Sequence, residues 1–379
     1  MKKFRVGVVG VGYIGAVHIE QLRRLGYTEV AALVEINDPK GKADALFVPK
    51  SYSNYKEMID KENLDCIHIC TSNESHYEIA DYALDKGLHV VCEKPLSISS
   101  SEAEKLVKKA KEKGLINAVN YNYRYYPMAY QMREMINAGE LGDVYTVHGG
   151  YLQDWLYLDT DYNWRLEPEL SGDSRAFSDI GTHWLDLVQF TTGLKATELL
   201  ADFATFHKNR KKPTKPIETF SGMALRPEDY KTVPINTEDY ATVLFHFENG
   251  ARGCCNISQV YAGRKNQVIL SIAGSKCSLH WDSENSNSLW VGRRETMNGD
   301  LVKEPSILKP STRKISAYPG GHVEGFSESF KQNFEKIYKA IQAGKQTEGE
   351  YATFADGLKE MIFCEKVIQS AKERCWVKI

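Results

Sequence analysis

The chain has 379 residues, too many for one ordinary core and typical of two or three domains. It is 42% hydrophobic and 26% charged, as in an ordinary soluble globular protein, and its formal net charge of −2 argues against nucleic acid or an acidic membrane as a partner. No apolar stretch is long enough to span a bilayer. The one basic cluster, residues 207–215, is short and contains proline, and we interpret it as a solvated loop.

The chain begins with an apolar, β-rich run, a glycine turn and a helical pattern. Gly10, Gly12 and Gly15 match the motif G-x-G-x-x-G. These glycines permit a tight turn, a close approach of the backbone to a pyrophosphate, and close packing of the helix on the strand. The helix then offers its first N–H groups and the positive end of its dipole to the phosphates. Its place directly after the first strand favours a dinucleotide site over a turn without a ligand.

The second predicted strand, residues 30–35, ends in Glu35. An acid at this position is expected to accept hydrogen bonds from the hydroxyls of an adenosine ribose. The same carboxylate would repel a 2′-phosphate, and no arginine follows it directly. We therefore predict NAD rather than NADP as the cofactor, although Lys40 and Lys42 are near enough to keep NADP as the less favoured alternative.

Strands and helices then alternate up to about residue 124, which predicts a doubly wound parallel sheet. Ligands bind such sheets beyond the carboxyl ends of the strands. Three polar segments fall there: residues 71–73, 93–95 and 122–124. Lys94 is the most informative of these, because a lysine at a strand tip faces the crevice where a nicotinamide lies. Its alternative role is an ion pair with Glu93.

The pattern changes from about Asp143, where long alternating runs replace the strand–helix units. Residues 239–260 predict a hairpin that turns at Asn249-Gly250, and residues 266–281 predict another that turns at Gly274-Ser275. One face of such a sheet must be covered, often by another subunit, so we expect a homo-oligomer, a dimer or a tetramer. Helical patterns return at about 322–343 and 353–372.

Between these regions, the stretch FSDIGTHWLDL (177–187) predicts a helix with two stripes. Asp179 and His183 are four residues apart and share one face, with Asp186 almost above them. A separate apolar stripe gives the helix a packing surface; it consists of Ile180, Trp184, Leu187 and Val188. Taken alone, the polar stripe fits a helix cap and a packed histidine as well as it fits an acid–base pair.

Several motifs together resemble the Gfo/Idh/MocA family, the relatives of glucose–fructose oxidoreductase and inositol dehydrogenase. They are GVGYIG, CTSNESHYEIADYALDKGLHVVCEKP, NYNYRYYP and DIGTHWLDL, and the likeness extends to the C-terminal 28 residues. The resemblance implies an α/β chain: an NAD-binding Rossmann domain over residues 1–124, then an α+β domain over residues 125–379 with a large, mostly antiparallel open sheet. The last helix is expected either to pack on this sheet or to return to the first domain.

The family's active site uses a lysine, an aspartate and a histidine, which the resemblance maps onto Lys94, Asp179 and His183. In this picture His183 removes a proton from a substrate hydroxyl while a hydride leaves the same carbon. Asp179 orients the imidazole, and Lys94 stabilises the developing alkoxide. Some members of the family assign the role of the base to the lysine, and the sequence does not choose between the two.

The glycine motif and the resemblance together assign the cofactor site. Its predicted residues are Gly10, Gly12, Tyr13, Ile14, Gly15, Glu35, Thr71, Ser72, Asn73, His76, Glu93, Lys94, Asn122 and Arg124. The segment T-S-N departs from the family's usual T-P-x, because Ser72 replaces a proline.

The segment 149–184 leads into the predicted catalytic helix and is rich in aromatic and acidic residues. Sugars are bound by flat rings and by groups that hydrogen-bond hydroxyls. We therefore predict a substrate site formed, with Asp179 and His183, by Tyr151, Asp154, Trp155, Trp164 and Arg165. The alternative for each tryptophan is that it packs the loop. Arg264 or Lys265 either joins this site or makes a subunit contact.

The eight cysteines form no C-x-x-C pair, so we predict no metal site and reduced cysteines in a cytoplasmic protein. The predicted function is NAD-dependent hydride transfer between a secondary alcohol of a sugar, sugar derivative or cyclic polyol and nicotinamide, in a direction that the sequence leaves open. One alternative is a non-catalytic sensor of NAD and sugar. The other is an NAD-dependent glycosidase that oxidises its sugar transiently.

Overall fold

The computed structural model describes residues 3–215 and 226–379. The chain forms two compact units: Met1–Tyr130 with Pro310–Met361, and Gln131–Lys309 with Ile362–Ile379. Each unit is described separately below. The domain boundary expected after Arg124 stays a prediction, since this division follows compactness alone.

The first unit contains a six-stranded sheet in the order β3-β2-β1-β4-β5-β6, in which every pair of neighbours is parallel. Its strands are β1 (Phe4–Val9), β2 (Thr28–Val34), β3 (Ser51–Tyr52), β4 (Cys66–Ile69), β5 (His89–Cys92) and β6 (Asn117–Val119). The order reverses between β1 and β4, as in a doubly wound sheet whose ligand site lies at the switch point. The predicted Rossmann architecture is confirmed.

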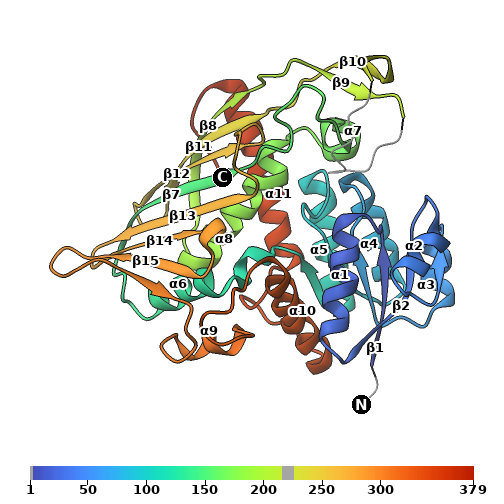
Figure 1. The fold of residues 1–379 in the computed structure, drawn as a ribbon, viewed down its shortest axis with the longest axis horizontal. Coiled ribbons are helices and arrows are strands. Elements are labelled where there is room, and N and C mark those ends of the chain that lie inside the picture. Colours follow the sequence, from blue (N-terminus) through green and yellow to red (C-terminus); the bar gives the residue numbers. More distant parts are fainter. Residues whose placement is uncertain (1–2, 216–225) are drawn as a thin grey trace. The chain divides into compact units, whose positions relative to one another are not determined.

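Helices cover both faces of this sheet (Figure 1). The helices that lie wholly in this unit are α1 (Tyr13–Arg24), α2 (Pro39–Ala45), α3 (Tyr55–Lys61), α4 (His76–Asp85), α5 (Ser100–Lys113), α9 (Pro310–Ile315) and α10 (Phe326–Ala343). One hydrophobic cluster joins the sheet to α1 and α10, and a second joins it to α3, α4 and α5. The apolar strands β1 and β4 are buried on both faces for this reason, as is usual in parallel sheets.

The ends of α5 follow the signals in the sequence. The Ser99 hydroxyl accepts a hydrogen bond from the backbone N–H of Glu102 at 3.3 Å, and the helix ends at Gly114 with a φ of 64°. The segment 115–127 contains one short strand and one turn. Only β6 is extended, and a 3₁₀ turn over Asn122–Tyr125 follows it.

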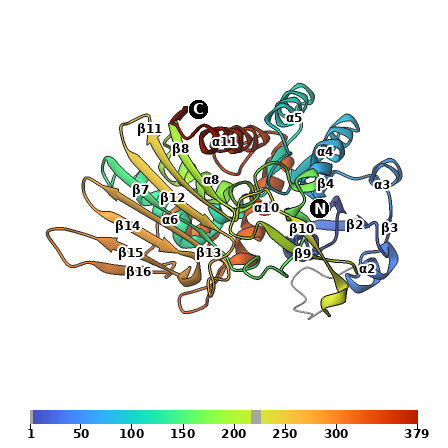
Figure 2. The same cartoon turned by 90° about the horizontal axis from the view of Figure 1, so that it is seen from above.

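The second unit contains a nine-stranded sheet in the order β16-β15-β14-β13-β7-β12-β11-β8-β17. These strands run side by side in Figure 2, and all neighbouring pairs are antiparallel except β7 and β12. They are β7 (Val144–Leu152), β8 (Ala196–Ala204), β11 (Tyr240–Phe247), β12 (Arg252–Ser258), β13 (Gln267–Gly274), β14 (Ser278–Asp282), β15 (Ser288–Gly292), β16 (Gly299–Val302) and β17 (Val377–Lys378). Both predicted hairpins are confirmed: β11 pairs with β12, and β13 pairs with β14.

The basic cluster at 207–215 is not a solvated loop, which corrects the prediction. It forms β9 (Asn209–Pro213), which pairs with β10 (Tyr230–Pro234) in a two-stranded sheet. Arg210 is fully buried there, and Lys212 forms an ion pair with Glu167 at 2.6 Å. Much of the positive charge is therefore neutralised within the protein.

The helices α7 and α8 lie wholly in the second unit, and α6 and α11 each cross the division between the units. Their bounds are α6 (Pro127–Asn137), α7 (Pro168–Ser171), α8 (Thr182–Thr192) and α11 (Phe354–Glu373). The indole N–H of Trp184 on α8 donates to the carbonyl of Ile269 on β13 at 2.9 Å, which fixes α8 against the sheet. None of the described helices is long and apolar enough to cross a membrane. All eight cysteines are free.

Candidate active site

The glycine turn between β1 and α1 has the geometry that the motif predicts. Gly10 has a φ of 82°, a conformation that glycine adopts without strain. A Cβ atom on Gly15 would lie 2.0 Å from the carbonyl oxygen of Gly10, so any side chain there would push the helix away from the turn. Among the described residues, no side chain caps the N-terminus of α1. Its first N–H groups are therefore suited to an anionic ligand.

Glu35 follows β2 and reaches back to this turn. Its Oε2 atom accepts a hydrogen bond from the backbone N–H of Val11 at 3.0 Å, and its Oε1 atom accepts from the N–H of Ile36 at 2.8 Å. The acid therefore lies beside the glycine turn, as a ribose-binding carboxylate must. Together with the uncapped helix, this arrangement fits an NAD-type dinucleotide.

The predicted residues after β4 form a network of their own. Thr71 Oγ1 accepts a hydrogen bond from Ser75 at 2.7 Å, and the Ser72 hydroxyl donates to Glu74 at 2.7 Å. His76 is buried, with its ring nitrogens 2.7 Å from the carbonyl of Pro95 and 3.2 Å from that of Thr71. His76 thus ties the loop after β4 to the loop after β5. Asn73 is buried at the start of the 3₁₀ turn Asn73–Ser75.

Glu93, at the tip of β5, is held by a buried polar chain. Its Oε1 atom lies 2.9 Å from Nε2 of His18 and accepts from the Asn120 amide at 2.5 Å. The Nδ1 atoms of His18 and His68 are 2.9 Å apart, and His68 Nε2 lies 3.0 Å from the hydroxyl of Tyr338 on α10. Burial raises the pKa of Glu93, but His18 and Asn120 lower it more, to about 2. Glu93 is therefore ionised at neutral pH.

Lys94 is partly buried and follows Glu93 directly. Its backbone N–H donates to the Oε2 atom of Glu93 at 3.3 Å. The buried chain thus holds the main chain that carries Lys94.

Asn122 and Arg124 lie in the 3₁₀ turn after β6, and both are buried. The Asn122 amide donates to the hydroxyl of Ser329 on α10 at 2.8 Å. Burial would raise the pKa of Asp356, but the Arg124 guanidinium and the backbone N–H of Thr353 lower it. Asn122 therefore contacts the segment 310–361 of the same unit, and the charge of Arg124 acts on that segment through Asp356.

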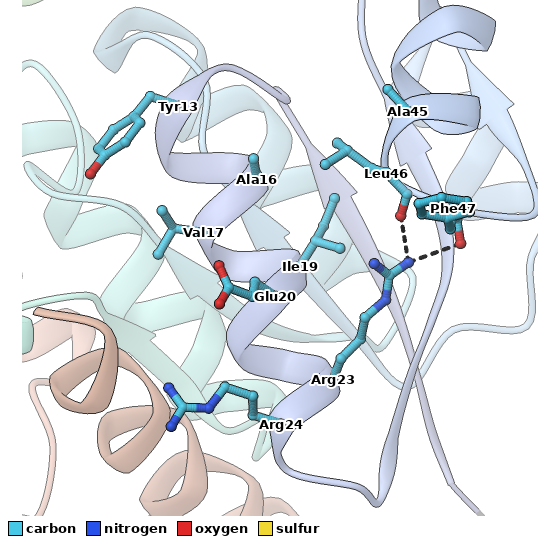
Figure 3. A pocket seen from close by; sticks show the side chains of 10 residues that line it. All are labelled: Tyr13, Ala16, Val17, Ile19, Glu20, Arg23, Arg24, Ala45, Leu46 and Phe47. Atoms are coloured by element: carbon cyan, nitrogen blue, oxygen red, sulfur yellow. Dashed lines mark hydrogen bonds between the residues drawn. The ribbon is translucent and has the colours of Figure 1, made fainter.

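A pocket of about 600 Å³ lies on the outer face of α1 (Figure 3). Residues 45–47 form its other wall, where the Arg23 guanidinium donates to the carbonyl of Phe47 at 2.9 Å. Tyr13 is the one predicted cofactor residue in this lining, and it is 58% exposed and stacked on Phe326. Ile14 lies on another side of the helix and packs against the core.

In the second unit, the stretch 177–187 differs from a regular helix. Phe177–Gly181 forms a π-helical turn, in which the N–H of Thr182 donates to the carbonyl of Phe177. The α-helix α8 begins only at Thr182. The apolar stripe is buried as predicted. The polar stripe of Asp179, His183 and Asp186 is buried as well, so neither stripe faces solvent. Single π turns inside helices often occur at functional sites.

Both carboxylate oxygens of Asp179 accept hydrogen bonds. Arg165 Nε donates to Oδ1 at 2.9 Å, and the Gln259 amide donates to Oδ2 at 3.0 Å. Arg165 also lies over the ring of Trp164, with 4.5 Å between the guanidinium carbon and the ring centroid. Two of the predicted substrate residues, Trp164 and Arg165, are thus joined to Asp179.

His183 is 8% exposed, and its ring lies 6.1 Å from that of Tyr151. The Tyr151 hydroxyl donates to Asn266 at 2.6 Å, and the Gln153 amide donates to the same oxygen at 2.8 Å. These bonds place a set of polar groups beside His183. Such a set suits a ligand with several hydroxyls.

The other predicted substrate residues are held in different ways. Asp154 accepts from Lys265 at 2.7 Å and from the backbone N–H of Gly263 at 3.1 Å. Trp155 is partly buried. Arg264 forms an ion pair with Glu284 at 2.7 Å, so Lys265, and not Arg264, contacts a predicted site residue.

Three residues of this site were missed by sequence reasoning: Gln259, Arg175 and Asp239. Arg175 donates to Gln259 at 3.1 Å and to Asp239 at 2.5 Å, and all three side chains are buried. The available signal was weak. Arg175 precedes the D-I-G-T-H stretch and Gln259 follows a predicted strand, and an arginine or glutamine at such a place is common in proteins. The buried polar residues His18 and Asn120 of the first unit were missed for the same reason. No group of three or more potential metal ligands occurs in the part of the chain that the structure describes.

Comparison with family models gives two matches. Residues 4–121 match the model described as oxidoreductase family, NAD-binding Rossmann fold, and residues 130–280 match the GFO/IDH/MocA C-terminal domain. Both models belong to the family that the motifs resemble, and together they cover most of the chain.

Individual proteins are similar over nearly the whole chain. Levoglucosan dehydrogenase of Pseudarthrobacter phenanthrenivorans is 25% identical, over 100% of this chain and 99% of that protein. Myo-inositol 2-dehydrogenase of Thermotoga maritima is 26% identical, over 99% of this chain and 98% of that protein. The structure of an inositol dehydrogenase homolog complexed with NAD⁺, from Azotobacter vinelandii, is 25% identical with a TM-score of 0.85, over 100% of this chain and 98% of that one.

Proposed function

The chain belongs to the GFO/IDH/MocA family of oxidoreductases, and from this premise we propose that it is an NAD-dependent dehydrogenase of a sugar, a sugar derivative or a cyclic polyol. The carrying observation is the set of polar groups around Asp179 and His183 on the π turn and α8. Levoglucosan dehydrogenase and myo-inositol 2-dehydrogenase, which act on such substrates by name, support the substrate class.

In the proposed reaction a secondary alcohol loses a hydride from carbon and a proton from oxygen, and a carbonyl group forms. When bound, the nicotinamide cofactor accepts the hydride. His183 takes the proton, because imidazole titrates near neutral pH. Asp179, held by Arg165 and Gln259, orients this part of the site, and Lys94 stabilises negative charge on the reacting oxygen.

NAD is the proposed cofactor. Glu35 lies beside the glycine turn, where its carboxylate suits the ribose hydroxyls of NAD and repels the 2′-phosphate of NADP. The complex of the Azotobacter vinelandii homolog with NAD⁺ supports this choice. We also propose a cytoplasmic location and a homo-oligomeric assembly.

Turnover of free substrates tests the proposal. Purified protein is incubated with levoglucosan, myo-inositol, glucose and other aldoses and polyols, with NAD and NADP in parallel, and the reduced cofactor is measured by absorbance. We expect net NADH from at least one free sugar or polyol. A protein that binds NAD but produces no net NADH from any of them would instead be the sensor or the transiently oxidising glycosidase.

Two substitutions test the proposed roles of the side chains. His183→Ala and Lys94→Ala are each expected to lower kcat by roughly 10²- to 10⁴-fold, since they remove an acid–base group and a charge-stabilising group. NAD binding, followed by fluorescence titration, is expected to remain. Lys86→Ala is the control, because Lys86 forms an exposed ion pair with Asp60. Wild-type turnover in both site variants would overturn the assigned roles.

A further inference from the structure

We propose that Gln259 is a positioning residue that holds the Asp179 carboxylate in one orientation. Its amide group lies between Asp179 on the π turn and the buried Arg175. The inference rests on the proposed function, because the orientation of Asp179 affects turnover only if Asp179 takes part in the proposed reaction.

The orientation of the Gln259 amide is fixed by its partners. Arg175 can only donate hydrogen bonds, and its Nη1 atom lies 3.1 Å from Oε1 of Gln259. The amide oxygen therefore faces Arg175, and the amide NH₂ group faces Asp179. Gln259 can then only donate to Oδ2 of Asp179, at 3.0 Å. A hydrogen bond donated to a carboxylate stabilises its charged form.

Arg175 is itself immobilised by the segment 237–239. Its Nη2 atom donates to Asp239 at 2.5 Å, and its Nε atom donates to the Thr237 hydroxyl at 3.1 Å. Arg175 and Asp239 are both fully buried. The amide of Gln259 is therefore attached to a rigid, charged support, and this geometry resists rotation of the amide.

The same segment also holds the backbone that carries Asp179. Glu238 accepts hydrogen bonds from the backbone N–H groups of Arg175 and Phe177, each at 3.0 Å. These residues come directly before and at the start of the π turn. One segment thus fixes Asp179 twice, through the main chain by Glu238 and through the side chain by Gln259.

The two donors to Asp179 differ in exposure. The Arg165 side chain is 20% exposed and belongs to the loop that contains most of the predicted substrate residues, whereas Gln259 is 2% exposed. Arg165 is therefore the partner that a ligand can displace, and Gln259 is the permanent one. The plane of the Asp179 carboxylate is then set before a substrate arrives, which is how supporting residues make a site precise.

The test compares two variants of Gln259 with a matched control. Gln259→Leu removes both hydrogen bonds at similar volume, and Gln259→Glu keeps an acceptor for Arg175 while removing the donor to Asp179. Gln267→Leu is the control: Gln267 is also 2% exposed, lies in the same sheet, and donates to a carboxylate, that of Asp282, at 2.7 Å. All three variants lose an amide–carboxylate hydrogen bond.

Kinetics are measured with NAD and whichever of levoglucosan, myo-inositol and glucose the wild type oxidises best. We expect both Gln259 variants to lower kcat by roughly ten- to a hundredfold, the effect of losing a hydrogen bond to a charged group. KM for NAD is expected to stay within a factor of two of wild type, and the control is expected to keep wild-type kcat. Equal losses in Gln259→Leu and Gln267→Leu, or wild-type kcat in Gln259→Glu, would overturn the proposal.

A crystal structure of the Gln259→Leu variant separates this inference from the proposed function. We expect the Asp179 carboxylate to rotate away from its wild-type orientation, and this result does not depend on any substrate. If the wild type oxidises nothing in the panel, the proposed function fails while the structure still tests the positioning. An unchanged Asp179 in that structure would overturn the positioning alone.

Discussion

Glu93 carries a full charge in the core of the first unit. It is 8% exposed, and its partners are His18 and Asn120. Burial alone would favour the neutral acid, so the low pKa of about 2 depends on these partners. The arrangement joins helix α1, the tip of β5 and the segment after β6 through a single carboxylate. The main chain of Lys94 is attached to the same group.

This carboxylate predicts acid-sensitive stability. Its folded pKa of about 2 lies below the ordinary value of 4.5, so its contribution is present above about pH 4.5 and is lost as the pH falls toward 2. The contribution is at most about 3 kcal/mol. Urea unfolding of the wild type is therefore expected to lose stability over this range, and Glu93→Gln is expected to lose less. Glu348→Gln, at an exposed position, is the control and should retain the wild-type pH dependence. Identical pH dependence in Glu93→Gln would contradict the prediction.

Among the elements, the segment 154–166 depends on one buried arginine. The Arg210 guanidinium donates to the carbonyls of Leu156 and Leu158 at 2.8 Å each and to Asp239 at 2.8 Å. Burial lowers the pKa of Arg210, and Asp239 opposes this shift. Arg210 thus connects the first half of the loop to Asp239, which also accepts a hydrogen bond from Arg175.

Removing this arginine is expected to loosen the loop. Arg210→Met removes hydrogen bonds to four acceptors, the carbonyls of Leu156, Leu158 and Asp161 and the Asp239 carboxylate, and leaves part of a buried charge uncompensated. This costs about 3–5 kcal/mol of stability. Hydrogen exchange of residues 154–163 is expected to accelerate, and KM for the sugar is expected to rise while NAD affinity stays constant. Lys211→Met is the control: Lys211 pairs with Asp159 at 3.5 Å at a half-exposed position, and this pair contributes at most about 1 kcal/mol. Unchanged exchange in Arg210→Met would show that the loop is held by other contacts.

Most regular elements could be predicted from the sequence, but the π turn and the strand β9 could not. The hairpins follow from local alternation and turn residues, which hold whatever the rest of the chain does. The π turn has no such local signal, because its extra residue is stabilised by packing and by Glu238, 61 residues away from Phe177. The strand β9 was missed because its inward-facing residue is a buried arginine between polar neighbours, so the sequence shows no alternation of apolar and polar residues.

Site residues follow the same rule. The geometry of Gly10, Gly15 and Glu35 follows the prediction because it depends on neighbours in a common motif, and their role in cofactor binding stays a prediction. The partners of Asp179 are 14 and 80 residues away, so they depend on how the chain folds. Arg165 was predicted to bind substrate, and its bond to Asp179 shows how such a residue is held in place beforehand.

At the scale of the whole molecule, the nine-stranded sheet has two unlike faces. One face consists largely of buried apolar side chains such as Val243, Phe245 and Cys255. The registers place a row of residues on the opposite face: Leu200, Leu244, Cys254, His148, Ser271, His280 and Trp290. Leu244 is 39% exposed and Trp290 is 36% exposed. A row that combines exposed apolar side chains at Leu244 and Trp290 with polar ones between them, on a broad, regular sheet, suits contact with a second copy of the chain.

If this face forms the contact between copies of a homo-oligomer, we expect one charge at the centre of the face to disrupt assembly. Leu244→Lys places an ammonium group between Leu200 and Cys254, its neighbours across the strands, where a partner copy would desolvate it. Light scattering after gel filtration is expected to give a dimer or tetramer for the wild type and a smaller species for the variant. Met297→Lys is the control, since Met297 is 90% exposed in the β15–β16 turn. A monomeric wild type, or a variant of wild-type mass, would mean that this face does not form the assembly.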